Sequence, residues 1–180
     1  SGKSVVSRLL RIMGYSVYDT DSEAKRLMES SLEVVQKLSE CFGRDIYHNG
    51  RLNRGLLSSR VFGESDKIVL LNSIVHPVVR FDFYRWSESL NEEICFVESA
   101  ILYESRFDEL VDEVWTVTAP EELRIGRVRQ RSGLTEEEIK KRMAAQLSEE
   151  EKQRRAAHII WNDGNVSVIH RVLSLLKSLE

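Results

Sequence analysis

The chain opens with a residue pattern that is typical of phosphate binding. Ser1-Gly2-Lys3-Ser4 matches the end of the pattern G-x-x-x-x-G-K-[S/T], and apolar residues at helical spacing follow directly. In such a loop the backbone N–H groups and the helix N-terminus hold phosphate, the lysine reaches the β- and γ-phosphates, and the hydroxyl binds Mg²⁺. We therefore expect Lys3 to bind phosphate and Ser4 to bind Mg²⁺. The alternative is a surface turn that caps a helix.

Three carboxylates follow segments that are predicted to be strands. Asp19 and Asp21 come after the β-prone run 15–18 and open a helix, and Glu98 ends the apolar run 94–97. Phosphoryl transfer depends mainly on positioning and charge neutralisation, so one carboxylate at the acceptor hydroxyl is sufficient. The aspartates supply that base, cap the helix, or do both, since aspartate is a favoured N-cap. Glu98 either contacts Mg²⁺ or is an ordinary strand-end carboxylate.

A cluster of arginines lies in the second half of the chain. Arg124, Arg127 and Arg131 are spaced three and four apart, so they share one face of a predicted helix. Arg142 and Gln146 share a face on the helix that comes next. Arginines on a mobile flap neutralise the charge of a transferring phosphoryl group. The alternative is a solvated basic face that pairs with the glutamates at 136–138.

The segments that carry these residues alternate between helix and strand. The continuous apolar runs 94–97, 114–117 and 158–161 are typical of buried parallel strands. Helical spacing or capping-box signals predict helices over 4–13, from Thr20, over most of 22–90, over 120–131, from Thr135, from Ser148 and over 166–179. This alternation predicts an α/β fold with one parallel sheet. Two helical excursions, about 22–90 and 127–155, interrupt it.

Shorter signals refine this outline. Asn49-Gly50 predicts a turn within the first excursion. His76-Pro77 is interpreted as the end of one helix and the start of another. Cys41 and Cys95 lie far apart and form neither a metal-ligand spacing nor a disulfide framework, so we expect reduced thiols and a cytosolic protein.

Composition excludes several classes of function. The chain has 180 residues and a net charge of −3, which argues against a general nucleic-acid binder because such proteins usually carry a basic excess. No run of about 18 apolar residues predicts a membrane span, and we expect no secretory leader. No group of His, Cys, Asp or Glu has the spacing of a zinc site.

Taken in order, these pieces resemble the dephospho-coenzyme A kinase family over nearly the whole chain. The matching segments are Ser1-Gly2-Lys3-Ser4, Val17-Tyr18-Asp19-Thr20-Asp21, Cys41-Phe42-Gly43, Gly50-Arg51-Leu52-Asn53-Arg54, His76-Pro77, Ile101-Leu102-Tyr103-Glu104, Arg142 with Gln146, and Asn162 with Gly164. No single piece is decisive, but their shared order and spacing are highly specific. Two departures are Ala100, where the family usually has proline, and His158, where an aspartate is common.

The resemblance implies a fold and an activity. The fold is a P-loop three-layer α/β/α domain with a five-stranded parallel sheet, a helical acceptor-binding region at about 22–90 and a lid at about 127–155. The reaction is ATP plus dephospho-coenzyme A giving ADP and coenzyme A, the last step of coenzyme A biosynthesis, with the ribose 3′-hydroxyl as acceptor. In the family, the first strand and the first half of the P-loop precede the position of Ser1, and we expect them in the parent protein.

The resemblance also assigns roles to the candidate residues. The expected catalytic residues are Asp21 as base, Lys3 and Arg131, and the residues expected to support Mg²⁺ are Ser4 and Glu98. The residues expected to bind ATP are Ser1, Gly2, Lys3, Ser4, Arg127, Arg131 and Asn162, of which Asn162 would lie near adenine. The residues expected to bind the acceptor are Asp21, His76, Arg142 and Gln146. ATP and dephospho-coenzyme A are the expected partners of a cytoplasmic monomer. The alternatives are a nucleoside or nucleoside-monophosphate kinase and a nucleotide-binding module without transfer activity.

Overall fold

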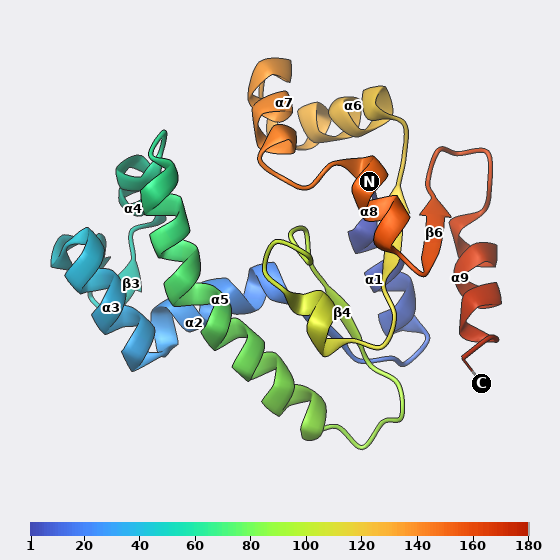
Figure 1. Ribbon diagram of the computed structural model, residues 1–180, viewed down its shortest axis with the longest axis horizontal. Helices are drawn as coiled ribbons and strands as arrows, with labels where there is room; N and C mark the ends of the chain where they lie inside the picture. The colour runs from blue at the N-terminus through green and yellow to red at the C-terminus, as the bar shows by residue number, and fades with distance from the viewer. Residues whose placement is uncertain (180) are drawn as a thin grey trace. The chain divides into compact units, whose positions relative to one another are not determined.

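The computed structural model describes residues 1–179, which fall into two compact units. The phosphate unit comprises Ser1–Val17 and the segment from Ile101 onward, and the acceptor unit comprises Tyr18–Ala100. Figure 1 shows the helices and strands of both units. The chain passes through the acceptor unit once and then returns to complete the phosphate unit. The N-terminal helix therefore packs with elements from the second half of the sequence.

The phosphate unit is built around a parallel strand pair. Its elements are α1 (Lys3–Ile12), the 3-10 helix η2 (Phe107–Leu110), β5 (Trp115–Thr118), α6 (Glu121–Ser132), α7 (Glu136–Ala144), α8 (Glu149–Arg155), β6 (His158–Trp161) and α9 (Val168–Leu176). Strands β5 and β6 run parallel, with Trp115 opposite His158 and Thr118 opposite Trp161. Helix α9 contacts both β6 and α1, and Leu10, Ile160 and Val172 are buried in this core.

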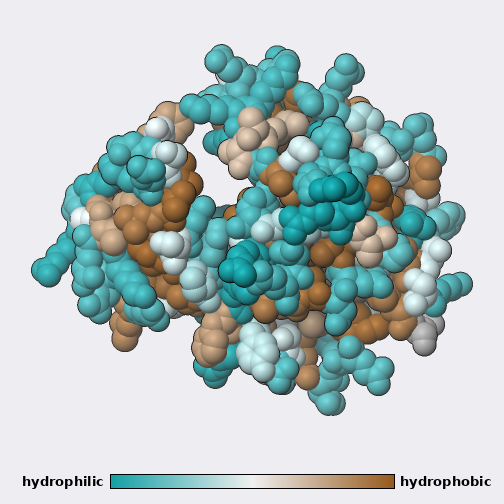
Figure 2. Space-filling view, viewed as in Figure 1, coloured by the Kyte–Doolittle hydropathy of each residue, from teal (hydrophilic) through white to brown (hydrophobic). Residues whose placement is uncertain are grey.

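The acceptor unit is mainly helical. Its elements are β1 (Val17–Asp19, which begins at the last residue of the phosphate unit), α2 (Thr20–Ser30), α3 (Leu32–Phe42), the 3-10 helix η1 (Arg44–Ile46), β2 (Tyr47–His48), β3 (Arg51–Leu52), α4 (Arg54–Val61), α5 (Ser65–Glu88) and β4 (Phe96–Glu98). Helices α2, α3 and α5 contact one another, and strand β1 pairs with β4. Figure 2 shows hydrophilic side chains over much of the visible surface, with hydrophobic patches between them.

These elements confirm the predicted α/β class. The described strands form three two-stranded sheets, which are β1–β4, β2–β3 and β5–β6. The predicted turn at Asn49-Gly50 joins β2 to β3 in an antiparallel hairpin. Both turn residues have positive φ, 49° at Asn49 and 75° at Gly50, as a two-residue hairpin turn of this hand requires. The strand predicted over 158–161 has the same bounds in the structure, and the helix predicted over 120–131 corresponds to α6, which covers Glu121–Ser132.

Two local predictions are wrong. His76-Pro77 does not separate two helices, because both residues lie inside the 24-residue helix α5. The proline ring removes one backbone donor there, but the packing of α5 against α2 and α3 outweighs that local cost. Thr20 does not cap α2 either, since the N-cap is Asp19, and the Thr20 hydroxyl donates instead to the backbone oxygen of Glu98 at 3.0 Å.

The other two capping-box predictions had different outcomes. At Thr135 the complete box is present, with Thr135 bound to the backbone N–H of Glu138 and the Glu138 carboxylate bound to the backbone N–H of Thr135. At Ser148 the hydroxyl accepts from the backbone N–H of Glu151 at 3.2 Å, as predicted. The Glu151 carboxylate, however, binds Arg154. A nearby arginine thus engages the glutamate that a capping box would use.

Candidate active site

The end of the predicted phosphate loop lies against the end of strand β6. Gly2 has φ +107° and precedes α1, whose first turn binds back to its carbonyl through the backbone N–H of Val5 at 3.0 Å. The side-chain amide of Asn162 donates to the carbonyl of Ser1 at 2.9 Å. A Cβ added to Gly2 would lie 2.0 Å from Nδ2 of Asn162. Glycine is therefore required here both by backbone conformation and by close contact.

Asn162 thus has a role that sequence reasoning missed. The resemblance placed it beside adenine, which stays a prediction. Its amide holds the phosphate loop, and its backbone N–H donates to the carbonyl of Thr118 at 2.8 Å, which extends the β5–β6 pairing by one bond. The pattern Asn162-x-Gly164 marked the position in the sequence. No spacing rule relates it to Gly2, because the contact joins the two ends of the chain.

Positive charge gathers around this loop. The side chains of Lys3, Arg124 and Arg127 lie near the backbone nitrogen of Ser1, and Glu149 is the acidic side chain near it. Lys3 is the first residue of α1 and is half-buried, and Ser4 follows it in the same turn. The structure therefore brings Lys3 and Arg127 to the loop, together with Arg124. This arrangement suits an anion, since it adds charged side chains to the positive end of a helix.

The side chain of Glu149 joins three elements next to this loop. Its Oε2 accepts from the hydroxyl of Thr118 at 3.0 Å, and its Oε1 lies 3.1 Å from Nη1 of Arg124 and 3.5 Å from Nζ of Lys152. Thr118 ends β5, Arg124 lies in the first turn of α6, and Lys152 lies in α8. The sequence contained no signal for this cluster beyond the helix start at Ser148.

The remaining basic and polar candidates lie on and after the helices α6 and α7. Arg131 is exposed in the last turn of α6, and Arg142 is exposed near the end of α7. Gln146 does not share a helix face with Arg142, because α7 ends at Ala144. The Gln146 side chain instead accepts from Nζ of Lys152 at 3.3 Å. The next residue, Leu147, donates its backbone N–H to Glu104 at 2.6 Å.

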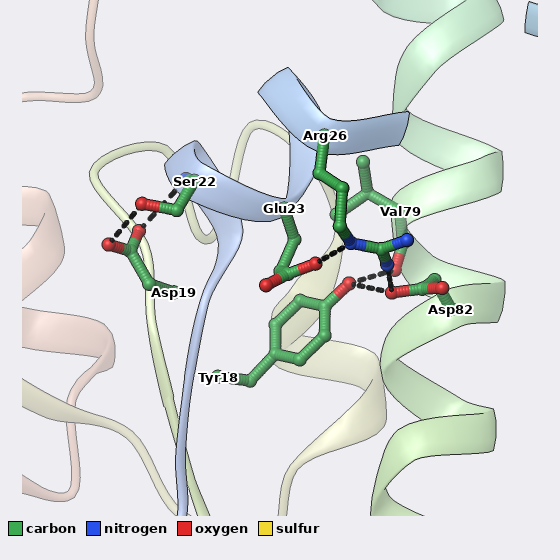
Figure 3. A network of polar contacts seen from close by, with 7 residues as sticks. All are labelled: Tyr18, Asp19, Ser22, Glu23, Arg26, Val79 and Asp82. Atoms are coloured by element: carbon green, nitrogen blue, oxygen red, sulfur yellow. Dashed lines mark hydrogen bonds and ion pairs between the residues drawn. The ribbon is translucent and has the colours of Figure 1, made fainter. Parts of the chain in front are cut away.

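In the acceptor unit, the two aspartates of the D-x-D segment have different surroundings. Asp19 caps α2: it accepts from the backbone N–H groups of Asp21 at 3.1 Å and Ser22 at 3.2 Å, and from the Ser22 hydroxyl at 2.8 Å. Figure 3 shows the contacts with Ser22. Asp21 is exposed in the first turn of the same helix. Capping therefore engages Asp19, and Asp21 is the better candidate for the base.

A second polar network holds the strand that leads into this segment (Figure 3). The buried Tyr18 donates its hydroxyl to Asp82 of α5 at 2.7 Å, and Nη2 of Arg26 donates to the same carboxylate oxygen at 2.7 Å. Arg26 also pairs with Glu23. Burial, followed by the hydrogen bond to Asp82, raises the pKa of Tyr18. The network thus ties β1 and α2 to α5 immediately beside Asp19.

Two further candidates belong to the acceptor unit. His76 is half-buried in α5, and burial lowers its pKa. Glu98 ends strand β4, and its backbone oxygen accepts the hydroxyl of Thr20. Within residues 1–179, no group of three or more His, Cys, Asp and Glu side chains forms a site that holds a metal by itself. None of the helices over the same residues is both long and apolar enough to cross a membrane.

The fold and the loop geometry define the class of the protein. A G-K-S loop that precedes a helix, beside the carboxyl ends of two parallel strands, is typical of P-loop kinases and related nucleotide-binding proteins. The model of one family, described as dephospho-CoA kinase, matches residues 1–167. The chain therefore belongs to the dephospho-CoA kinase family.

Individual relatives agree with this assignment. The chain is 38% identical to the dephospho-CoA kinase of Porphyromonas gingivalis over 180 residues, covering 99% of this chain and 89% of that protein. It is 39% identical to the dephospho-CoA kinase of Bacteroides fragilis, with 99% and 88% covered. The crystal structure of TT1252 from Thermus thermophilus superposes with a TM-score of 0.85 at 34% identity, covering 99% of this chain and 91% of that one. The dephospho-CoA kinase of Campylobacter jejuni shares the fold, with a TM-score of 0.72.

Proposed function

We propose that this protein transfers the γ-phosphoryl group of ATP to the ribose 3′-hydroxyl of dephospho-coenzyme A, giving coenzyme A and ADP. The observation that carries the proposal is the family match over residues 1–167, which includes both the phosphate loop and the D-x-D segment. The geometry agrees with it. Asn162 and Gly2 shape an anion-binding loop in one unit, and the other unit presents Asp21 at the start of a helix.

In this reaction the acceptor oxygen forms a bond to the γ-phosphorus while the bond from that phosphorus to the β–γ bridging oxygen breaks. ADP leaves, and the proton of the acceptor hydroxyl passes to the Asp21 carboxylate. Lys3, Arg127 and Arg131 neutralise negative charge on the phosphates, which is the main contribution a protein makes to phosphoryl transfer. Asp19 stays on the N-terminus of α2 and supports the first turn that carries Asp21.

The remaining assignments are part of the same proposal. His76, Arg142 and Gln146 bind the acceptor, and Asn162 lies near adenine as well as on the loop. The segment 127–155 is a lid, and 22–90 is the acceptor-binding region of a single kinase domain. The enzyme works as a cytoplasmic monomer.

Magnesium binding is consistent with the oxygen donors that the chain offers. Mg²⁺ in ATP sites is usually bound by one or two protein oxygens together with substrate phosphates and water, so an all-protein cage isn't needed. The hydroxyl of Ser4 at the start of α1 and the carboxylate of Glu98 at the end of β4 are donors of this kind. When bound, the ion would neutralise negative charge on the phosphates of ATP.

The test is ADP release by the full-length protein with ATP, Mg²⁺ and dephospho-coenzyme A. We expect rapid turnover that stops when the acceptor is omitted, with phosphate recovered on the 3′-oxygen of the product. Turnover with nucleosides or nucleoside monophosphates, and none with dephospho-coenzyme A, would instead identify a nucleotide kinase. ATP binding without transfer to any acceptor would identify a binding module.

A further inference from the structure

Glu149 is anchored far more firmly than the other acidic side chains of the segment that contains it. The side chains of Glu149, Arg124 and Lys152 are 20%, 13% and 14% exposed. On the same segment, the pairs Lys140–Glu136 and Arg154–Glu151 include side chains that are more than half exposed. Exposed pairs contribute little, whereas breaking a largely buried one leaves an uncompensated charge. The position of Arg124 therefore depends on Glu149.

The guanidinium of Arg124 has no second anchor at its Nε atom. That atom is buried and has no hydrogen-bond partner within residues 1–179. The contact of Nη1 with Glu149 is thus the interaction that orients the side chain. Glu149 is in turn oriented by the hydroxyl of Thr118 at the end of β5. A chain of contacts therefore runs from the strand through Glu149 to the first turn of α6.

The orientation of Arg124 sets the direction of the basic face of α6. Arg124, Arg127 and Arg131 are three and four residues apart and lie on one side of the helix. Glu149 binds Thr118, whose carbonyl accepts the backbone N–H of Asn162, and Asn162 holds the carbonyl of Ser1. Arg124 and Arg127 also lie near the backbone nitrogen of Ser1, so this part of the face is turned toward the phosphate loop. Rotation of α6 about its axis would move Arg127 away from the loop, and Arg131, on the same helix face, would turn with it.

We propose that Glu149 is a positioning residue, which holds Arg124 against β5 and so keeps Arg127 and Arg131 facing the transferring phosphoryl group. Because Glu149 lies in α8 and Arg124 in α6, this ion pair also joins the helix that leads into the proposed lid, 127–155, to the helix that ends it. The inference rests on the proposed function. A positioning role predicts that loss of Glu149 lowers kcat much more than it changes the KM for ATP, whereas a purely structural role predicts that both are impaired together.

Glu149→Gln keeps the shape of the side chain and removes its charge. Loss of a negative charge beside the phosphate loop makes the potential there more positive and offsets the weaker ground-state contacts of the displaced arginines with ATP, so the KM for ATP changes much less than kcat. The arginines lose their orientation, so kcat falls by about tenfold to a hundredfold, as misplacement by about 1 Å does elsewhere. A general loss of structure would instead weaken ATP binding and turnover together.

The experiment compares steady-state kinetics of the wild type, Glu149→Gln, Arg124→Gln and the double variant, each with its melting temperature. Glu151→Gln is the matched control, because Glu151 lies on the same helix and pairs with the exposed Arg154; its kcat should stay within twofold of the wild type. The kcat of the double variant should be no lower than that of the slower single variant, because the effects of substitutions at coupled residues are not additive. If Glu149→Gln folds and keeps more than half of kcat, or if the two losses add, the inference is overturned.

These outcomes are separable from failure of the proposed function. A wild type that turns over a different hydroxyl acceptor contradicts the proposed substrate, and the same four proteins then test Glu149 with that acceptor. A wild type without turnover on any acceptor overturns both proposals. Wild-type turnover that Glu149→Gln leaves unchanged overturns the positioning role alone.

Discussion

The phosphate unit and the acceptor unit each contain a carboxylate that joins side chains from different elements, but the two clusters differ in charge. Glu149 meets two cations, Arg124 and Lys152, and the hydroxyl of Thr118. Asp82 meets one cation, Arg26, and the hydroxyl of Tyr18. In the phosphate unit, two cations and one anion give the cluster a net charge of +1. In the acceptor unit, Arg26 also pairs with Glu23, so one cation and two anions give the cluster a net charge of −1.

This difference suits the two tasks. A site for the phosphates of ATP gains from excess positive charge, because the ligand is strongly anionic. In the acceptor unit, Arg26 pairs with two carboxylates, so its cluster adds no excess positive charge to the unit that carries Asp21. The same kind of cluster thus holds each unit together without opposing its chemistry, and changes in the two units should affect turnover and ATP binding differently.

The largest expected effect comes from Asp21 in the acceptor unit. Asp21→Asn removes the proton acceptor, and we expect kcat to fall by about 10²–10⁴-fold, while the affinity for ATP measured by calorimetry stays within about twofold. Asp19→Asn is the matched control, because asparagine caps helices as well as aspartate does. Equal losses in the two variants, or a larger loss for Asp19→Asn, would remove the distinction between base and cap.

In the phosphate unit, Gly2→Ala should act on ATP binding. A Cβ would lie 2.0 Å from Nδ2 of Asn162, and the φ of +107° is strained for alanine. Strain of this kind costs about 1–3 kcal/mol, so ATP affinity should fall by about 5- to 150-fold in a calorimetric titration. Gly126→Ala serves as control, because Gly126 has nothing within 4 Å of an added Cβ and lies in helix α6. That variant should bind ATP as the wild type does and be slightly more stable.

Tyr18→Phe tests the anchor of the acceptor unit. It removes the buried hydrogen bond to Asp82 but leaves the aromatic packing of Tyr18 with Phe83 and Trp86. We expect the free energy of unfolding in urea to fall by about 1–2 kcal/mol. Tyr84→Phe, at an exposed position of the same helix α5, should change it by less than about 0.5 kcal/mol. Equal effects of the two changes would show that the Asp82 cluster isn't the anchor of this unit.

The smallest expected effect is a pH dependence in the acceptor unit. Burial lowers the pKa of His76, so below the unfolded value of about 6.5 the unfolded chain binds more protons than the folded one, and stability falls as pH falls. His76→Gln should therefore lose less thermal stability than the wild type between pH 8 and pH 5. The exposed His48→Gln is the control and should follow the wild type. If the thermal stability of His76→Gln changed with pH as much as that of the wild type, His76 would be excluded as the source of this pH dependence.

Local sequence signals predicted much of the fold. The Asn49-Gly50 turn, the capping box at Thr135 and the strand 158–161 depend on residues close together in the chain, and all three are present. The predictions that failed were also local but had competitors. Pro77 lies within a helix whose packing outweighs a lost backbone bond, and Thr20 lost the cap to the neighbouring Asp19.

The candidate site divides in the same way. The sequence by itself determined the G-K-S loop end, the D-x-D segment and the basic face of α6, because each is a short pattern whose chemistry depends on residue type and spacing. Only the tertiary structure decided that the side chain of Asn162 packs against Gly2, that Glu149 pairs with Arg124, and that the Tyr18 hydroxyl donates to Asp82. Each of these contacts joins residues far apart in sequence. Local spacing carries no information about them, since they form only when packing of the apolar faces brings the elements together.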